Sequence, residues 1–140
     1  MINYIKALII MLKAHWKQRD KGNHLYIFHP IRVSRNCKSK SAKIVALLHD
    51  VMEDNPNYSL RDFKFLKEEE KEALALLTHN KDVSYFDYVN EVKNNKIARE
   101  VKLSDLQDNS NLDRLLTVTE KDIKRLEKYK VAQKILSNYN

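Results

Sequence analysis

The chain has 140 residues, of which 43% are hydrophobic and 32% are charged, and its formal net charge is +7. This length suits one domain and is too short for two, and the apolar fraction supplies a buried core, which excludes a disordered chain. One Gly and two Pro are too few chain breakers for a sheet protein rich in tight turns. We therefore predict a single all-α domain over residues 1–140, a helical bundle of six to eight helices.

The cysteine content and the charge limit the cellular location and the kinds of partner that can be expected. The single cysteine, Cys37, cannot form an internal disulfide, which is typical of the reducing cytosol, so a cytoplasmic location is predicted. No apolar stretch approaches the ~20 residues needed to cross a bilayer, so no membrane partner is expected. The basic residues are spread along the chain without a dense run. This pattern favours a solvated surface with a local pocket for phosphates over a specific nucleic-acid partner.

In the first third of the chain, the apolar spacing predicts three helices separated by one loop. Residues 3–18 repeat apolar side chains at helical spacing, so one stripe should pack in the core. That stripe consists of Ile5, Leu8, Ile9, Leu12 and Trp16. Residues 19–28 hold the only Gly and three charges, and we expect a loop there. Pro30 suits the first turn of a short helix over residues 29–33, and a longer helix follows over about 42–52.

The remainder of the chain also reads as helix, and no segment is a convincing strand. A short capped helix is predicted over 59–62, and further helices over 68–77, 85–92 and 97–106. Thr119 and Asp122 have the spacing of a capping box ahead of a long last helix. The buried stripe predicted for that helix consists of Ile123, Leu126, Ala132 and Ile135.

The strongest chemical signal is the stretch 47–54, Leu-Leu-His-Asp-Val-Met-Glu-Asp. In a helix, spacings of three and four bring side chains onto one face. The polar residues of this stretch would then share one arc: His49, Asp50, Glu53 and Asp54. An acidic corner on a largely buried helix is unfavourable unless a cation lies beside it. We therefore expect a divalent metal ion here.

Two other polar residues occur in apolar surroundings, His29 within residues 26–31 and Asp105 within residues 101–106. Taken singly, each is more often structural. Together with His49 and Asp50 they give two imidazoles and two carboxylates on three helices, a set that suits Mn²⁺, Fe²⁺, Co²⁺ or Zn²⁺ better than Ca²⁺ or Mg²⁺. Such an ion polarises a phosphoryl oxygen and lowers the pKa of a bound water toward ~7. The two spare carboxylates of the central stretch could orient or deprotonate that water.

Three ordered motifs carry a family resemblance. They are residues 18–30 (Gln-Arg-Asp-Lys-Gly-Asn-His-Leu-Tyr-Ile-Phe-His-Pro), residues 49–54 (His-Asp-Val-Met-Glu-Asp) and residues 102–109 (Lys-Leu-Ser-Asp-Leu-Gln-Asp-Asn). A His, a later His-Asp pair and a distant Asp resemble the pattern of the HD phosphohydrolase superfamily. The motifs are similar above all to the hydrolase domains of RelA/SpoT-type alarmone enzymes, in particular the small, hydrolase-only members. The similarity runs from about His15 to Ala132 and implies an HD-domain helical bundle.

The resemblance implies a metal-dependent hydrolase, usually a Mn²⁺ enzyme. Such enzymes remove the 3′-pyrophosphate from guanosine tetraphosphate or pentaphosphate (ppGpp or pppGpp). By motif position, the metal ligands would be His29, His49, Asp50 and Asp105. Glu53 and Asp54 match the pair credited with water activation.

The resemblance also implies contacts to the nucleotide. The loop that covers the guanine in such enzymes would supply Arg19, Lys21 and Tyr26 as substrate-binding residues. Asn109 matches a nucleotide-contacting Asn, while Lys102 and Arg114 could neutralise phosphates.

The same loop departs from the family pattern. The usual Gly-x-Pro-Tyr is replaced by Gly-Asn-His-Leu-Tyr at residues 22–26, which is one residue longer and lacks the Pro. This change leaves the metal chemistry intact and keeps two alternatives open. One is an HD-type phosphatase for another nucleotide, such as a nucleoside monophosphate or NADPH. The other is a catalytically silent nucleotide-binding regulatory domain, against which Glu53 and Asp54 argue, because a silent domain has no physical need of two extra carboxylates beside a metal.

Overall fold

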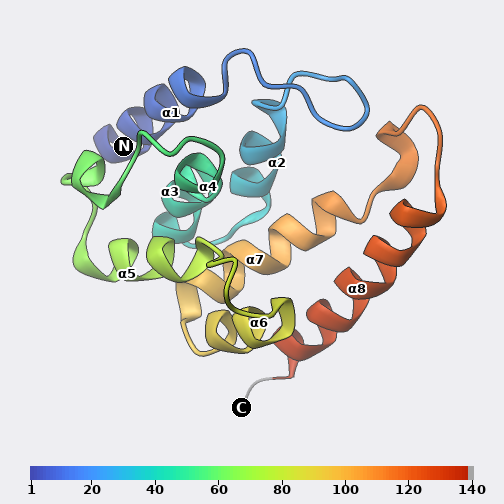
Figure 1. The fold of residues 1–140 in the computed structure, drawn as a ribbon. Helices are drawn as coiled ribbons and strands as arrows, with labels where there is room; N and C mark the ends of the chain where they lie inside the picture. The colour runs from blue at the N-terminus through green and yellow to red at the C-terminus, as the bar shows by residue number, and fades with distance from the viewer. Residues whose placement is uncertain (139–140) are drawn as a thin grey trace.

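The computed structural model describes residues 1–138, and this part of the chain folds into eight α-helices and two short 3₁₀ helices (Figure 1). The elements are α1 (Ile2–His15), α2 (Phe28–Asn36), α3 (Lys40–Leu48), α4 (Val51–Asp54), η1 (Leu60–Phe63), α5 (Glu68–Leu77), α6 (Tyr85–Lys93), α7 (Lys96–Asn109), η2 (Leu112–Arg114) and α8 (Glu120–Ser137). Within residues 1–138, the only strand-like pairing is an isolated bridge between Arg19 and Leu25. The predicted all-α fold is therefore confirmed. Over the same residues, no helix combines the length and the apolar character needed to span a membrane.

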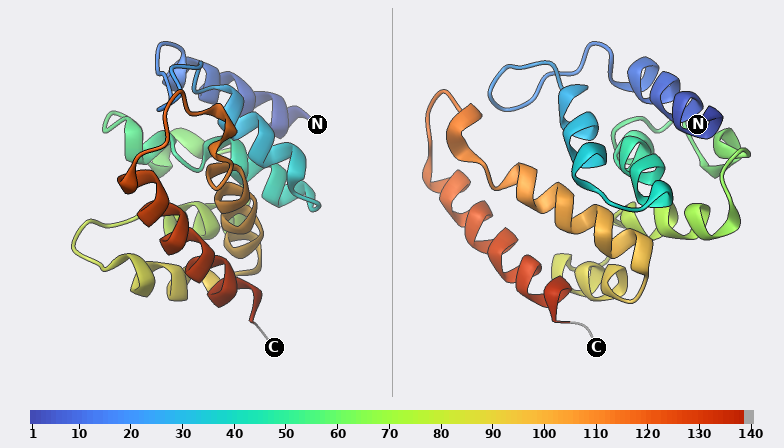
Figure 2. Two further views of the ribbon diagram at one scale, coloured as in Figure 1. Left: turned by 90° about the vertical axis from the view of Figure 1, so that its right-hand side faces the viewer. Right: turned by 180° about the vertical axis from the view of Figure 1, so that it is seen from behind.

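Helix α3 lies at the centre of the fold and packs against α1, α2, α5 and α7. Residues 45–48 at its C-terminal end are fully buried, which explains why a short helix can hold several neighbours together. Helix α7 packs against α2 and α3, and α8 lies at the edge of the molecule beside α6 and α7 (Figure 2). The C-terminal end of α3, the start of α2 and the middle of α7 consequently meet inside the molecule.

Two predicted helix starts are confirmed by their caps. Ser59 and Asp62 form a reciprocal capping box at η1. Thr119 and Asp122 form another at α8, where the Thr119 backbone N–H donates to Asp122 Oδ2 at 2.8 Å. In each case two backbone N–H groups that a helix end leaves unpaired are satisfied by side chains.

The buried face predicted for α1 is wrong. Three residues of the predicted stripe are substantially exposed: Ile5 (47%), Ile9 (46%) and Trp16 (64%). The buried residues of this helix are instead Ala7, Met11 and His15. These three share a face at spacings of four, and the apolar pattern missed that face because it counted the histidine as polar and the small alanine as uninformative. The helix also ends at His15 and not at residue 18.

The stripe predicted for α8 is wrong at its first position. Ile123 is 48% exposed, whereas Ala132 is buried as expected. The inner face of the first three turns of α8 lines a pocket and is largely polar: Asp122, Arg125, Leu126 and Tyr129. Ile123 does not lie on that face. A helix that borders a pocket can present polar side chains inward, so its apolar residues need not mark the inward face.

Candidate metal centre and adjoining pocket

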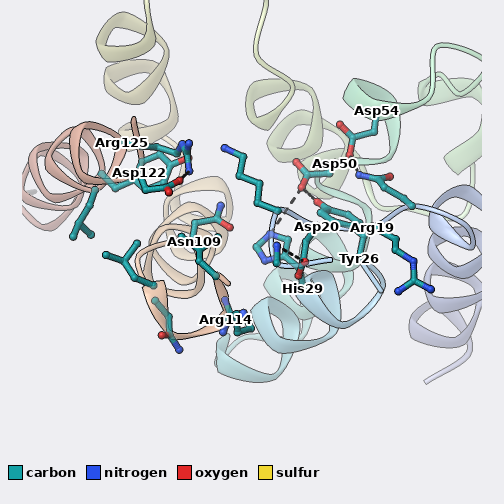
Figure 3. Close-up of a pocket in the computed structure, with 18 of the residues that line it drawn as sticks. Arg19, Asp20, Tyr26, His29, Asp50, Asp54, Asn109, Arg114, Asp122 and Arg125 are labelled. Atoms are coloured by element: carbon teal, nitrogen blue, oxygen red, sulfur yellow. Dashed lines mark hydrogen bonds and ion pairs between the residues drawn. The ribbon is translucent and has the colours of Figure 1, made fainter. Parts of the chain in front are cut away.

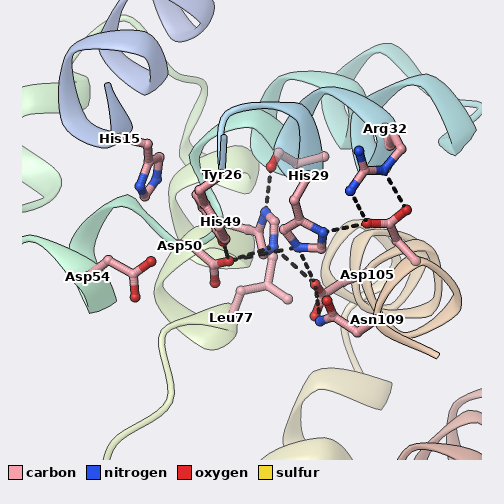
Figure 4. A network of polar contacts seen from close by, with 12 residues as sticks. His15, Tyr26, His29, Arg32, His49, Asp50, Asp54, Leu77, Asp105 and Asn109 are labelled. Carbon is pink, nitrogen blue, oxygen red and sulfur yellow. Dashed lines mark hydrogen bonds and ion pairs between the residues drawn. The ribbon is translucent and has the colours of Figure 1, made fainter. Parts of the chain in front are cut away.

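Four side chains able to bind a metal converge where α2, α7 and the turn between α3 and α4 meet (Figure 4). Each offers one nitrogen or oxygen, and these four atoms lie within 4.8 Å of one another. His29 comes from the start of α2, His49 and Asp50 from the turn, and Asp105 from α7. The fold thus brings together the four residues that the sequence singled out, and this cluster could hold a divalent ion.

The turn that carries His49 and Asp50 interrupts the helix predicted over residues 42–52. Helix α3 ends at Leu48 and α4 begins at Val51, so the prediction of one continuous helical arc is wrong. Asp50 lies between the two helices with φ −106° and ψ −1°, away from ideal helical values. In a continuous helix, consecutive side chains point about 100° apart. Here His49 Nε2 and Asp50 Oδ2 lie 3.2 Å apart, so the break lets two adjacent residues face one point.

Both imidazoles are oriented by oxygen atoms on their far sides. His29 Nδ1 lies 2.7 Å from Asp108 Oδ2. His49 Nδ1 lies 2.6 Å from the backbone carbonyl oxygen of Ala46. Because both oxygens accept, each Nδ1 carries a proton, and the Nε2 atoms face Asp105 Oδ1 at 2.9 Å from His29 and 3.2 Å from His49. Nitrogen lone pairs opposite a carboxylate oxygen repel it unless a proton or a metal ion lies between them, so this donor set can hold a divalent ion in place of protons.

Charges within the cluster shift the protonation of its members. Burial alone would lower the pKa of His49, but the charges of Asp50 and Asp105 raise it well above its ordinary value. Burial also opposes protonation of His29, and its hydrogen bonds to Asp105 and Asp108 outweigh that effect, so the His29 pKa is raised. Without a metal ion, the two rings therefore hold protons more tightly than free imidazoles do. A metal ion would have to displace them.

Asp108 is a functional candidate that the sequence reasoning missed. Its carboxylate is buried and bonds His29 through Oδ2. Arg32 donates to the same carboxylate from Nε at 2.8 Å and from Nη2 at 3.1 Å. Arg114 Nη2 donates to the Asp108 backbone oxygen at 2.7 Å. The signal available in the sequence was the spacing of Asp105 and Asp108, which places two acids on one face of a helix.

Lys102 and Asn109 both bond Asp105. Lys102 Nζ lies 2.9 Å from Asp105 Oδ2 and 5.4 Å from the centroid of the Tyr88 ring, and its side chain is only 14% exposed. Asn109 Nδ2 donates to Asp105 Oδ1 at 3.1 Å. The Lys102 charge helps hold the pKa of Asp105 well below its usual range, against the opposing effect of burial. Lys102 does not line the pocket described next, whereas Asn109 does.

A pocket of about 540 Å³ opens beside the cluster (Figure 3). Asp50 and Asp54 lie on one side of the pocket, and Arg125 with its partner Asp122 lies on the other. The pocket is also lined by residues predicted from the sequence to bind substrate, namely Arg19, Lys21, Tyr26 and Asn109. The arrangement gives an acidic end over the candidate metal site, whereas four cations and two carboxylates, Asp20 and Asp122, lie around the rest of the wall.

Helix α8 contributes pocket residues for which the sequence reasoning gave no functional prediction. Arg125 Nη1 donates to Asp122 Oδ1 at 3.0 Å, and Tyr129 follows one turn later on the same face. Lys21 belongs to the same region, because burial and then the Arg125 charge lower its pKa. The spacing of three and four among these α8 residues was visible in the sequence, but nothing there indicated that this face borders a pocket.

Glu53 and Asp54 are held by different partners. Glu53 Oε1 accepts a hydrogen bond from the backbone N–H of His79 at 2.6 Å. Burial and the nearby Asp50 charge raise the pKa of Glu53, even though the His79 bond favours its ionised form. Asp54 Oδ2 accepts from Gln18 Nε2 at 2.9 Å. Both carboxylates border the pocket, beside the ligand candidate Asp50.

The loop between α1 and α2 lines one side of the pocket. Asp20 Oδ1 accepts from the backbone N–H groups of Gly22 at 2.9 Å and His24 at 2.8 Å, and Asn23 adopts a left-handed conformation with φ 62°. A Cβ on Gly22 would lie 2.0 Å from the Arg114 carbonyl oxygen. The loop therefore docks backbone to backbone on η2, and only glycine fits at that contact. Tyr26, at the end of the loop, donates its hydroxyl to Asp50 Oδ2.

Of the comparisons with known proteins, the one with solved structures identifies a similar fold. No protein-family model matches the chain, and no curated protein matches it. Among solved structures, it is similar to a metazoan ortholog of SpoT that hydrolyzes ppGpp and plays a role in starvation responses, with a TM-score of 0.77 and 21% sequence identity. The similarity covers 100% of this chain and 88% of that chain. The likeness expected from the three motifs is thus confirmed for the fold, and at this identity it is the fold alone that is shared.

Proposed function

We propose that the chain is a metal-dependent pyrophosphohydrolase that removes the 3′-pyrophosphate of ppGpp or pppGpp. The observation that carries the proposal is the convergence of His29, His49, Asp50 and Asp105 at the acidic end of a pocket whose other walls carry cations. Hydrolysis of a pyrophosphate group needs the metal ion that the acidic end would hold. The remaining phosphates of the nucleotide need the cations to offset their negative charge. The fold shared with a ppGpp-hydrolyzing protein supports the same substrate.

The four donors would hold Mn²⁺, or Fe²⁺, Co²⁺ or Zn²⁺ in its place, since imidazole and carboxylate together suit these ions. Such an ion lowers the pKa of a coordinated water toward ~7 and polarises a phosphoryl oxygen. Asp108, behind His29, and Lys102 with Asn109, behind Asp105, would keep the two ligands in place.

Glu53 is the candidate that takes a proton from the attacking water, with Asp54 beside it to orient that water. A raised pKa makes Glu53 a stronger base than an ordinary carboxylate. Hydrolysis adds the hydroxyl of water to the phosphorus next to O3′, and the bond between that phosphorus and O3′ breaks. The proton that Glu53 has taken then passes to O3′, so ppGpp yields GDP and pyrophosphate.

The predicted substrate residues differ in their contacts. Arg19 and Lys21 border the pocket, and they remain candidates for contacts with the nucleotide. Lys102 bonds Asp105 and does not line the pocket, so we assign it to the support of a metal ligand. Tyr26 and Asn109 line the pocket and also bond Asp50 and Asp105, so both roles are open to them. Arg114 and Arg125 are further cations of the pocket wall that suit the phosphates distant from the reacting one.

A second substrate class uses the same catalytic groups. The loop over residues 19–26 lacks the family's Pro and is held by Asp20 and by the Gly22–Arg114 contact instead. A loop of this kind would fit another nucleotide, such as a nucleoside monophosphate or NADPH, if its base or ribose is bound differently. A silent nucleotide-binding domain remains the non-enzymatic alternative, and it would bind nucleotide without turnover.

A metal-loaded screen separates these functions. Protein loaded with Mn²⁺, Co²⁺, Fe²⁺ or Zn²⁺ is incubated with ppGpp, pppGpp, nucleoside monophosphates and NADPH, and the products are separated by ion-exchange chromatography. We expect GDP and pyrophosphate from ppGpp, and no turnover by His49→Ala. If only a different nucleotide is turned over, that nucleotide and not ppGpp is the substrate. No turnover of any nucleotide with any of the four metals would refute the enzymatic function.

A further inference from the structure

A fully buried histidine lies beside the pocket without belonging to the metal cluster. His15, the last residue of α1, has 0% of its surface exposed, and its ring centroid lies 4.8 Å from that of Tyr26 (Figure 4). Its Nδ1 is 2.7 Å from Gln18 Oε1, whereas its Nε2 has no hydrogen-bond partner in the described part of the chain. A buried nitrogen without a partner is unfavourable. The contact with Gln18 is therefore the polar interaction that sets the protonation of this ring.

The positions of the hydrogen atoms in the contacts from His15 through Gln18 to Asp54 follow from the chemistry of Asp54. The Asp54 carboxylate can only accept, so the group of Gln18 that lies 2.9 Å away must be its NH₂. The Gln18 carbonyl oxygen then faces His15, and Nδ1 of His15 must donate to it. Burial lowers the pKa of His15, which agrees with a neutral ring that carries its one proton on Nδ1. Each polar contact from His15 to Asp54 thus has a defined donor and acceptor.

We propose that His15 and Gln18 are positioning residues, which orient the Asp54 carboxylate toward the pocket. Asp54 is exposed at the end of the single-turn helix α4, and over residues 1–138 Gln18 donates the only side-chain hydrogen bond to it. The amide of Gln18 could turn over by half a rotation and present its oxygen to Asp54, but the buried Nδ1–H of His15 disfavours that orientation. This inference rests on the proposed function, in which Asp54 orients water.

The first test uses two amide replacements of the buried ring. In His15→Asn the amide nitrogen can occupy the place of Nδ1, whereas in His15→Gln it reaches the place of Nε2. With Mn²⁺-loaded protein and ppGpp, we expect His15→Asn to keep kcat within about threefold of wild type, and His15→Gln to lose about 10- to 100-fold, as a misplaced group does. KM and metal content should be unchanged in both. Equal kcat values for the two variants would overturn the proposal.

The second test changes Gln18, which is only half-buried, so a substitution there perturbs the core less than one at the fully buried His15. Gln18→Met should lower kcat as His15→Gln does. The double variant His15→Gln/Gln18→Met should lose no more kcat than either single variant, because the effects of residues that act through one path are not additive. Fully additive losses would overturn the proposal. Gln107→Met, the same change at an exposed position of α7, serves as the control and should keep wild-type kcat.

A third measurement needs no turnover. Nitrogen chemical shifts of the ¹⁵N-labelled metal-free protein report which ring nitrogen of His15 carries the proton. We expect Nδ1–H in the wild type and a changed ratio of the two tautomers in Gln18→Met. A ring protonated at Nε2 would overturn the positioning role even if the enzyme is active. Conversely, an inactive wild type with Nδ1–H in place would refute the proposed function and leave the hydrogen-bond chain intact.

Discussion

Replacing Asp108 by Asn tests how the protein holds its candidate metal ligand His29. The carboxylate of Asp108 accepts from His29 Nδ1 through one oxygen and from Arg32 through both. An Asn of the same shape has one oxygen, so it can satisfy His29 or the Arg32 Nε–H, and the other contact becomes donor against donor. Carboxylates that support a ligating histidine typically contribute 10- to 100-fold in metal affinity. We therefore expect the Mn²⁺ affinity of Asp108→Asn to fall by about 10- to 100-fold, or roughly 1.4–2.8 kcal/mol.

The assay is calorimetric titration of metal-free protein with Mn²⁺. Asp113→Asn is the matched control, because it removes the same charge from an exposed position five residues away, on η2. A general loss of negative charge would weaken metal binding equally in both variants. If Asp108→Asn and Asp113→Asn bind Mn²⁺ with the same affinity, the buried contact to His29 does not support the metal site and the reasoning is refuted.

Four further outcomes are expected. Glu53→Gln should retain Mn²⁺ and lose about 10²- to 10⁴-fold in kcat, as removal of a general base does; a variant that has also lost its metal would show that Glu53 is a ligand. Uptake of Mn²⁺ should release protons, because carboxylate charges raise the pKa of His29 and of His49 in the metal-free protein; affinity should then fall as pH is lowered, and a binding enthalpy that is the same in buffers of different ionisation heat would contradict this. Lys102→Met should lower the free energy of unfolding of the metal-free protein in urea by about 3 kcal/mol, since it removes the ammonium group that bonds Oδ2 of the buried Asp105 carboxylate, whereas a change no larger than that of the exposed-site variant Lys121→Met would argue against a buried ion pair. Gly22→Ala should lower the free energy of unfolding by about 1–3 kcal/mol, because its Cβ would lie 2.0 Å from the Arg114 carbonyl oxygen; an unchanged unfolding midpoint would mean that the loop does not dock there.

The chemical identity of the site was predictable from the sequence to a large extent. His29, His49, Asp50 and Asp105 stand in apolar surroundings, and buried groups of this kind need partners, so their meeting could be expected before the fold was seen. The residues that hold these four side chains in place were harder to predict from the sequence. Asp108 carried no prediction and Lys102 was predicted to neutralise phosphates, because the contacts of both depend on which face of α7 turns toward α2 and α3.

Errors of local geometry have a common physical origin. The apolar pattern extends through residues 47–54, yet α3 stops at Leu48, because the contacts of His49 and Asp50 with α2 and α7 outweigh helix propensity. In α1, the buried face follows His15 and not the larger apolar residues. In both places a polar side chain that belongs to the site or borders it determines how the backbone is placed, and periodicity of apolar residues does not carry that information.

The central claim is metal-dependent hydrolysis at the cluster of two histidines and two aspartates. It is tested most directly by measuring, in one sample, the bound Mn²⁺ per chain and the amounts of GDP and pyrophosphate formed from ppGpp. The account predicts about one bound ion and equal amounts of both products, with all three lost in His49→Ala. Product formation that is undiminished in His49→Ala, or a protein that binds the metal and forms no product from any nucleotide, would contradict it.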